Sequence, residues 1–219
     1  MIIEENLNCV VKIYVMNMNE LENLSNKLLQ SHVNEIDDYM EIISRLERLS
    51  RNETNSEYLK FFANAILARK LIEIGDYNKS NITLLCNILS LMGNMFRRYK
   101  LEITNEIWNF YLSCINIKDA KYYVYLFLPI FPQFKNYNLK WEFICNMPNI
   151  SPKKHSRENF YALIKHYANS KIVIPKEYKN KIINKFRDFL KDDKIGDYTK
   201  SNYIQLIALL LENTGNKHS

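Results

Sequence analysis

Apolar residues along this chain recur every three to four positions, which is the period of an amphipathic helix. The clearest stripe lies between charged residues and consists of Ile36, Tyr39, Met40, Ile43, Leu46 and Leu49. Further stripes of this period begin near residues 19, 58, 80, 104, 119, 139, 156, 175 and 200. The pattern predicts about ten helices of roughly 10–20 residues, joined by short polar loops.

Turn-forming residues predict where several of these helices end. The stretch 58–74 is apolar nearly all round, so we expect a central core helix that ends at Gly75. Gly93 is expected to end the following helix. Residues 147–156, MPNISPKKHS, are the best candidate for a loop or linker. On the polar side of the stripe at residues 36–49, Glu41–Arg45 and Glu47–Arg51 have the i,i+4 spacing of favourable ion pairs.

The predicted fold class is therefore all-α. Helices in antiparallel pairs that recur about every 35–45 residues suggest a HEAT-like α-solenoid, with a compact helical bundle as the alternative. We expect an N-terminal extension over 1–16, in which 9–16 permit a short strand. We expect a single helical domain over 17–215, which could be subdivided at 147–156. Residues 216–219 are expected to form a frayed tail.

Composition argues against a catalytic or metal site. The chain has 4 glycines in 219 residues, where an average chain has roughly fifteen, so loops of the kind that bind phosphates are not expected. No dinucleotide, P-loop, zinc-protease or nucleophile-elbow motif occurs. The 4 histidines and 4 cysteines lack metal-ligand spacing. We expect a protein that is not an enzyme, with no cofactor and no metal.

The dispersed cysteines, the hydropathy and the first residues together predict a protein of the cytoplasm. The longest apolar stretch, residues 122–131, is about half the length of a membrane span. The first residues carry two acids and no basic segment, unlike a signal peptide. We therefore expect reduced thiols and no membrane partner.

Charge is unevenly distributed along the chain. Residues 1–75 hold 8 basic and 12 acidic residues, a net charge of −4, whereas residues 76–219 hold 22 and 12, a net charge of +10. The densest acidic group is Glu35, Asp37, Asp38 and Glu41, and such acids are also favoured in the first turn of a helix. A second candidate surface, for nucleic acid, consists of Arg97, Arg98, Lys100, Lys153 and Lys154, near which several aromatic residues occur.

These helical pairs, exemplified by NELENLSNKLLQ (19–30) and DDYMEIISRLERLS (37–50), resemble the small all-helical immunity proteins of bacterial polymorphic and contact-dependent growth inhibition toxin systems. The resemblance implies a cytosolic protein that binds and neutralises one cognate toxin. If that toxin were a nuclease with a basic cleft, the acidic group at residues 35–41 would complement it. The leading expectation is a protein-binding module, and a nucleic-acid-binding helical repeat is the alternative.

Overall fold

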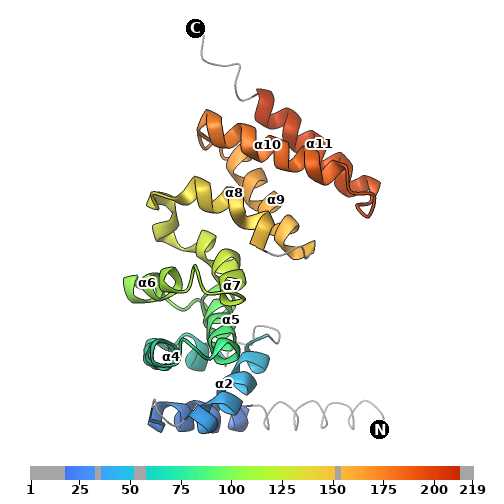
Figure 1. Cartoon of the computed structure of the whole chain (residues 1–219). Helices are drawn as coiled ribbons and strands as arrows, with labels where there is room; N and C mark the ends of the chain where they lie inside the picture. Colours follow the sequence, from blue (N-terminus) through green and yellow to red (C-terminus); the bar gives the residue numbers. More distant parts are fainter. Residues whose placement is uncertain (1–17, 33–35, 52–57, 151–153, 213–219) are drawn as a thin grey trace, which may run out of the picture. The chain divides into compact units, whose positions relative to one another are not determined.

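The computed structural model describes residues 18–32, 36–51, 58–150 and 154–212, and these are helical throughout most of their length (Figure 1). The all-α prediction is confirmed for these residues, in which no strand occurs. A first helix covers residues 18–30. The others are α2 (Ile36–Ser50), α3 (Leu59–Phe62), α4 (Ala65–Tyr77), α5 (Ile82–Tyr99), α6 (Asn105–Ser113), α7 (Ala120–Phe127), η1 (Leu128–Ile130), η2 (Pro132–Asn136), α8 (Lys140–Ile150), α9 (Lys154–Asn169), α10 (Lys176–Leu190) and α11 (Asp197–Glu212). The predicted strand at 9–16 and the tail at 216–219 lie outside the described residues.

The long core helix predicted over 58–74 is interrupted. The short helix α3 ends at Phe62, and Asn64 begins α4 by accepting hydrogen bonds from the backbone N–H groups of Ile66 (2.8 Å) and Leu67 (3.2 Å). An asparagine in an extended conformation is a favourable N-cap, and its competition with the helical backbone explains the break. The polarity pattern did not reveal this because Asn64 falls on the polar side of the stripe.

Two glycines predicted to end helices lie inside them instead. Gly75 is in the last turn of α4, and Gly93 is in the middle of α5. A Cβ at Gly75 would lie 2.7 Å from Phe110 of α6, and a Cβ at Gly93 would overlap the ring of Phe127 of α7. These glycines therefore allow neighbouring helices to approach closely, and the chain turns elsewhere.

The described residues cluster into two compact units, Met1–Pro132 and Gln133–Ser219, a boundary different from the one considered at 147–156. The predicted loop there is also shorter than expected, because α8 continues through Pro148 to Ile150 and α9 begins at Lys154. By sequence, unit 1 holds 14 basic and 16 acidic residues and unit 2 holds 16 and 8. Unit 1 has a net charge of −2 and unit 2 has a net charge of +8.

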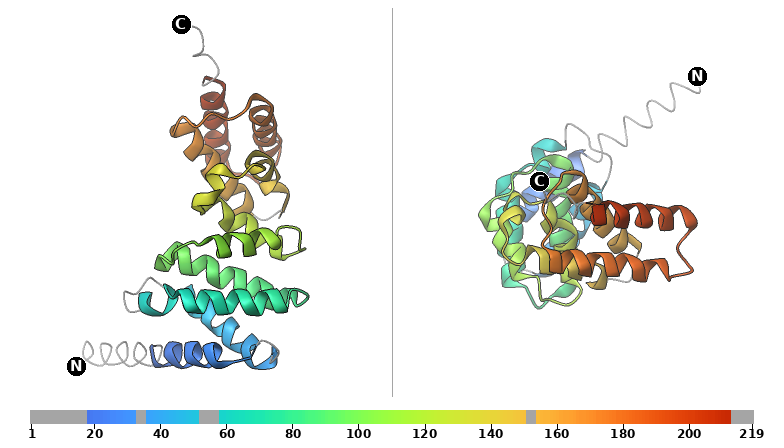
Figure 2. Two further views of the ribbon diagram at one scale, coloured as in Figure 1. Left: turned by 90° about the vertical axis from the view of Figure 1, so that its left-hand side faces the viewer. Right: turned by 90° about the horizontal axis from the view of Figure 1, so that it is seen from above.

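Unit 1 packs helices that are not adjacent in sequence. The helix α5 contacts both α2 and α7, while α4 contacts α6 (Figures 1 and 2). Aromatic rings fill the centre: Phe96 of α5 meets Phe127 (centroids 5.6 Å apart) and Phe131 (4.8 Å). Tyr111, fully buried, donates a hydrogen bond to the carbonyl of Leu89 at 2.7 Å. Because this side chain is desolvated, its pKa lies well above the usual value.

Unit 2 packs sequential helices, α8 on α9 and α10 on α11, and also alternate helices, α8 on α10 and α9 on α11. The right-hand view of Figure 2 shows α10 and α11, orange to red, running antiparallel. Phe160 stacks on Phe186 with ring centroids 5.1 Å apart, and Arg157 bridges to Asp192 at 2.7 Å. Contact between alternate helices is the packing expected inside each unit of a helical repeat.

Candidate partner-binding site

The candidate site is a groove in unit 1 between the helix at 18–30 and α2. Both helices bury their apolar stripes, which include Leu21 and Leu28 on one side and Ile43 and Leu46 on the other, all fully buried. Burial of these side chains turns the remaining faces to solvent. The two exposed faces border an open groove of about 740 Å³. Its lining comprises Glu20, Leu24, Lys27, Gln30, Ser31, Glu41, Ile42, Arg45 and Arg48.

The groove combines apolar and charged side chains. Leu24 and Ile42 are half-buried, one from each helix, and supply apolar surface. Lys27, Glu41 and Arg48 are exposed and carry charges of both signs. Such a mixed lining is compatible with contact to another protein, whose interfaces join an apolar centre to a polar rim.

One ion pair joins the two helices across the groove. The guanidinium of Arg45 donates to both carboxylate oxygens of Glu20, through Nε to Oε1 and through Nη2 to Oε2 at 2.9 Å. Hydrogen bonding from Arg45 holds the pKa of Glu20 below its usual value. The predicted partner of Arg45 was Glu41, one turn earlier on the same helix. That prediction is wrong because the bidentate pairing with Glu20 satisfies the guanidinium better than a single i,i+4 contact.

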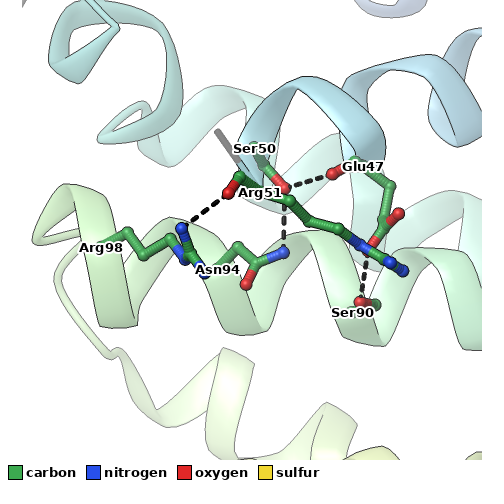
Figure 3. A network of polar contacts seen from close by, with 6 residues as sticks. All are labelled: Glu47, Ser50, Arg51, Ser90, Asn94 and Arg98. Atoms are coloured by element: carbon green, nitrogen blue, oxygen red, sulfur yellow. Dashed lines mark hydrogen bonds and ion pairs between the residues drawn. The ribbon is translucent and has the colours of Figure 1, made fainter. Parts of the chain in front are cut away.

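A buried polar network holds α2 on α5 and therefore positions one wall of the groove (Figure 3). The Glu47 carboxylate, 3% exposed, accepts a hydrogen bond from the Ser90 hydroxyl at 2.6 Å and pairs with Arg51 at 2.6 Å. Ser50, fully buried, accepts a hydrogen bond from the side-chain amide of Asn94 at 3.0 Å. Each buried side chain of this network, from Glu47, Ser50, Ser90 and Asn94, makes at least one hydrogen bond, as a buried polar cluster requires.

Successive residues of α2, and the residue that follows it, bond to successive residues of α5: Glu47 to Ser90, Ser50 to Asn94, and Arg51 to Arg98. The helices α2 and α5 therefore run in parallel, and their C-terminal ends lie together. Arg98 of α5 closes that end by donating to the carbonyl of Arg51 at 2.7 Å. The direction of α2, and with it the groove, is set by this alignment.

The predicted acidic group lies at the start of α2. Glu41 is exposed and lines the groove. Asp37 and Asp38 are in the first turn of α2, where the helix dipole favours acids. Glu35, and the side chains of Asp37 and Asp38, lie outside what the structure describes. The groove is not uniformly acidic, because Lys27 and Arg48 also line it.

The predicted basic group is divided between the two units. Arg97, Arg98 and Lys100 are exposed at the C-terminal end of α5 in unit 1. Lys154 begins α9 in unit 2, while Lys153 and the side chain of Lys154 lie outside the described residues. Arg51, which directly follows α2, lies beside Arg98 and joins these three basic residues of unit 1. Basic residues at helix C-termini also offset the helix dipole.

Sequence reasoning missed the residues from the helix at 18–30, namely Glu20, Lys27 and Gln30. Glu20 and Arg45 lie on consecutive helices, so their pairing could have been considered. The spacing of residues within one helix does not show which residue of the next helix a side chain contacts. Among the described residues, no group of three or more His, Cys, Asp or Glu side chains could hold a metal ion. No described helix is both long and apolar enough to cross a bilayer.

Comparison of the chain with models of protein families, with curated proteins and with solved structures finds no match in any of the three.

Proposed function

We propose that this protein is a non-catalytic protein-binding module, of the kind that binds and neutralises a cognate toxin as an immunity protein. The observation that carries the proposal is the groove of unit 1, with its apolar Leu24 and Ile42 between charged side chains. Protein interfaces of high specificity combine a small apolar centre with complementary charge around it. The groove requires no cofactor or metal in this role.

The acidic start of α2 is proposed to contact the partner. Glu41 lies in the groove, and Glu35, Asp37 and Asp38 precede it by at most six residues. Acidic side chains at the rim of an interface accelerate association with a basic partner and discriminate against acidic ones. A toxin with a basic substrate cleft would meet these requirements.

The role of the groove can be tested by co-expression. The protein is produced in a bacterial host together with a candidate toxin domain encoded by a neighbouring gene, and growth and complex formation are measured. The fourfold variant Glu35→Lys, Asp37→Lys, Asp38→Lys and Glu41→Lys is expected to lower affinity about tenfold or more, since like charges then face the partner. The matched control reverses four exposed acids of α4–α6: Glu73, Asp76, Glu102 and Glu106.

The control variant should bind the toxin domain with nearly unchanged affinity, because none of its four acids lines the groove. It should also stay folded, because surface ion pairs such as Lys79–Asp76 contribute little to stability. Equal affinity for both variants would reject the acidic start of α2 as the contact surface. Failure of the unmodified protein to protect the host would reject the immunity function itself.

Nucleic-acid binding is a second candidate, favoured by the meeting of α2 and α5 at their C-terminal ends. This places Arg51 beside Arg98, with Arg97 and Lys100 on the same short segment of chain. Binding to phosphates would weaken steeply with salt. Titration of a single-stranded oligonucleotide at two salt concentrations tests it, and Arg97→Gln with Arg98→Gln should abolish the binding. Affinity that does not change with salt would exclude this candidate.

A further inference from the structure

One end of unit 2 exposes aliphatic side chains in an unusual setting. The segment between α9 and α10, residues 172–175, has no regular secondary structure, and within it Val173 is 79% exposed and Ile172 is 39% exposed. Ile174, next in the chain, is buried and anchors the segment. Leu139, directly before α8, is 50% exposed. Ile172 and Val173 are therefore two adjacent aliphatic side chains that the core of this unit does not bury.

The packing of unit 2 brings these residues to the same end. The side chain of Lys185 in α10 donates to that of Asn149 in α8 at 2.7 Å, and the two helices pack against each other. In Figure 1, α8 and α10 both begin on the left side of this unit, and α9 ends there. The amide of Ile172 donates to the carbonyl of Tyr167, and the Tyr167 ring lies 5.6 Å from that of Trp141. The loop and the start of α8 therefore share one surface.

Basic and aromatic residues surround the aliphatic ones. Lys171 and Lys176 flank the loop and are exposed, as is Lys135. Lys140 lies over the Trp141 ring at 5.0 Å, and Lys181 lies over the Tyr178 ring at 4.9 Å. The acids of this end are Glu142 and Glu177, so the lysines outnumber them. We call this surface, consisting of residues 135–142 and 171–181, the basic end of unit 2.

We propose that the basic end of unit 2 binds the surface of an anionic lipid bilayer, with Ile172 and Val173 inserted between the headgroups. Aliphatic side chains supply apolar burial, lysines attract anionic lipids, and Trp and Tyr rings favour the interface. The net charge of +8 on this unit complements such a surface. Lysine stems can also lie along apolar surface while the ammonium reaches the headgroups.

This contact differs from a membrane span, and the sequence prediction of no membrane partner rested on spans. Hydropathy windows detect about 20 apolar residues in series, whereas two exposed residues in a loop do not raise a window average. The exposure of Ile172 and Val173 depends on tertiary structure. A nucleic-acid ligand would use the lysines and aromatic rings but gain nothing from the aliphatic loop.

The experiment is sedimentation of the full chain with vesicles of phosphatidylcholine alone, or of phosphatidylcholine mixed with phosphatidylserine. We expect stronger binding to the mixed vesicles and a decrease with salt. Ile172→Ser with Val173→Ser should weaken partitioning about tenfold or more. Lys171→Glu with Lys176→Glu should weaken it at least about twentyfold, since each lysine contributes about fivefold.

The matched control is Ile66→Ser, which removes an aliphatic side chain that is 65% exposed on α4 of unit 1. This variant should bind vesicles as the unmodified protein does, and circular dichroism should show all variants folded. The proposal is overturned if the unmodified protein binds neither vesicle, or if the loop variant binds as Ile66→Ser does. Binding of a single-stranded oligonucleotide by the lysines, with no vesicle binding, would also overturn it.

Discussion

The substitution Gly93→Ala tests the packing of α5 against α7. A Cβ built at Gly93 would lie within 2.5 Å of Cδ2 of Phe127 and closer still to Cε2 and Cζ, where carbon atoms normally stay about 3.5–4.0 Å apart. The Phe127 ring is 3% exposed and meets Phe96 edge to face, so it has little room to retreat. The added methyl group must therefore displace the ring or separate the helices.

Two opposing effects decide the size of the change. Alanine is favoured over glycine by about 1 kcal/mol in a helix interior. Overpacking of a dense core costs about 1–3 kcal/mol, and this site lies at the upper end because three ring atoms overlap. We expect Gly93→Ala to lower the free energy of unfolding of unit 1 by about 1–2 kcal/mol. Urea denaturation followed by circular dichroism measures the difference.

A double-mutant cycle and a control make the test specific. Phe127→Leu removes ring atoms from the contact, so Gly93→Ala should cost at least about 1 kcal/mol less in that background. Gly196→Ala is the matched control: no atom lies within 4 Å of a Cβ there, and its φ is not positive. That variant should change the free energy of unfolding by less than about 0.5 kcal/mol, because the lower entropy of its unfolded chain is offset by a poorer N-cap for α11. A Gly93→Ala protein as stable as the unmodified one would show that Phe127 does not cover Gly93.

Two further predictions concern the ion pair of the groove and the end of α5. Because Arg45 lowers the folded-state pKa of Glu20, their pairing stabilises the protein above the ordinary pKa of 4.5 and is lost as pH falls through the lowered value. Glu20→Gln should therefore be less stable than the unmodified protein at pH 7, and this difference in stability should vanish in acid. Urea midpoints at the two pH values measure the difference. A difference in stability that does not change with pH would contradict the prediction. Lys100 ends α5 at φ 58°, a left-handed conformation that disfavours residues other than glycine, so Lys100→Gly should stabilise by about 0.5–1 kcal/mol. A lower thermal midpoint for that variant would refute the reasoning.

The limits of sequence reasoning are clear at particular residues. The stripe at residues 36–49 predicted α2 and its buried face correctly, because a helix has the same period wherever it packs. Of the two ion pairs suggested by i,i+4 spacing, Glu47–Arg51 forms, whereas Arg45 bonds to Glu20 of another helix. Spacing specifies which side chains can meet on one helix but carries no information about a neighbouring helix.

The glycines and the candidate surfaces also show which features the sequence predicts and which depend on tertiary structure. A glycine that ends a helix and one that admits a neighbouring ring look alike in sequence, so Gly75 and Gly93 were assigned to the wrong role. Glu41 could be proposed as a contact residue, but its position beside Lys27 and Arg48 follows only from the pairing of two helices. The bringing together of Ile172, Val173 and Leu139 at one end of unit 2 likewise depends on α8 lying beside α10.

The sequence by itself determined that this protein is helical, where most helices lie and which faces they bury, since these properties depend on local period and capping. Tertiary structure alone decided which helices are neighbours, where α5 and α7 approach most closely, and which charged and aliphatic side chains share a surface. The physical reason is that these contacts join residues tens of positions apart, and their energies depend on distances in space that no local pattern encodes.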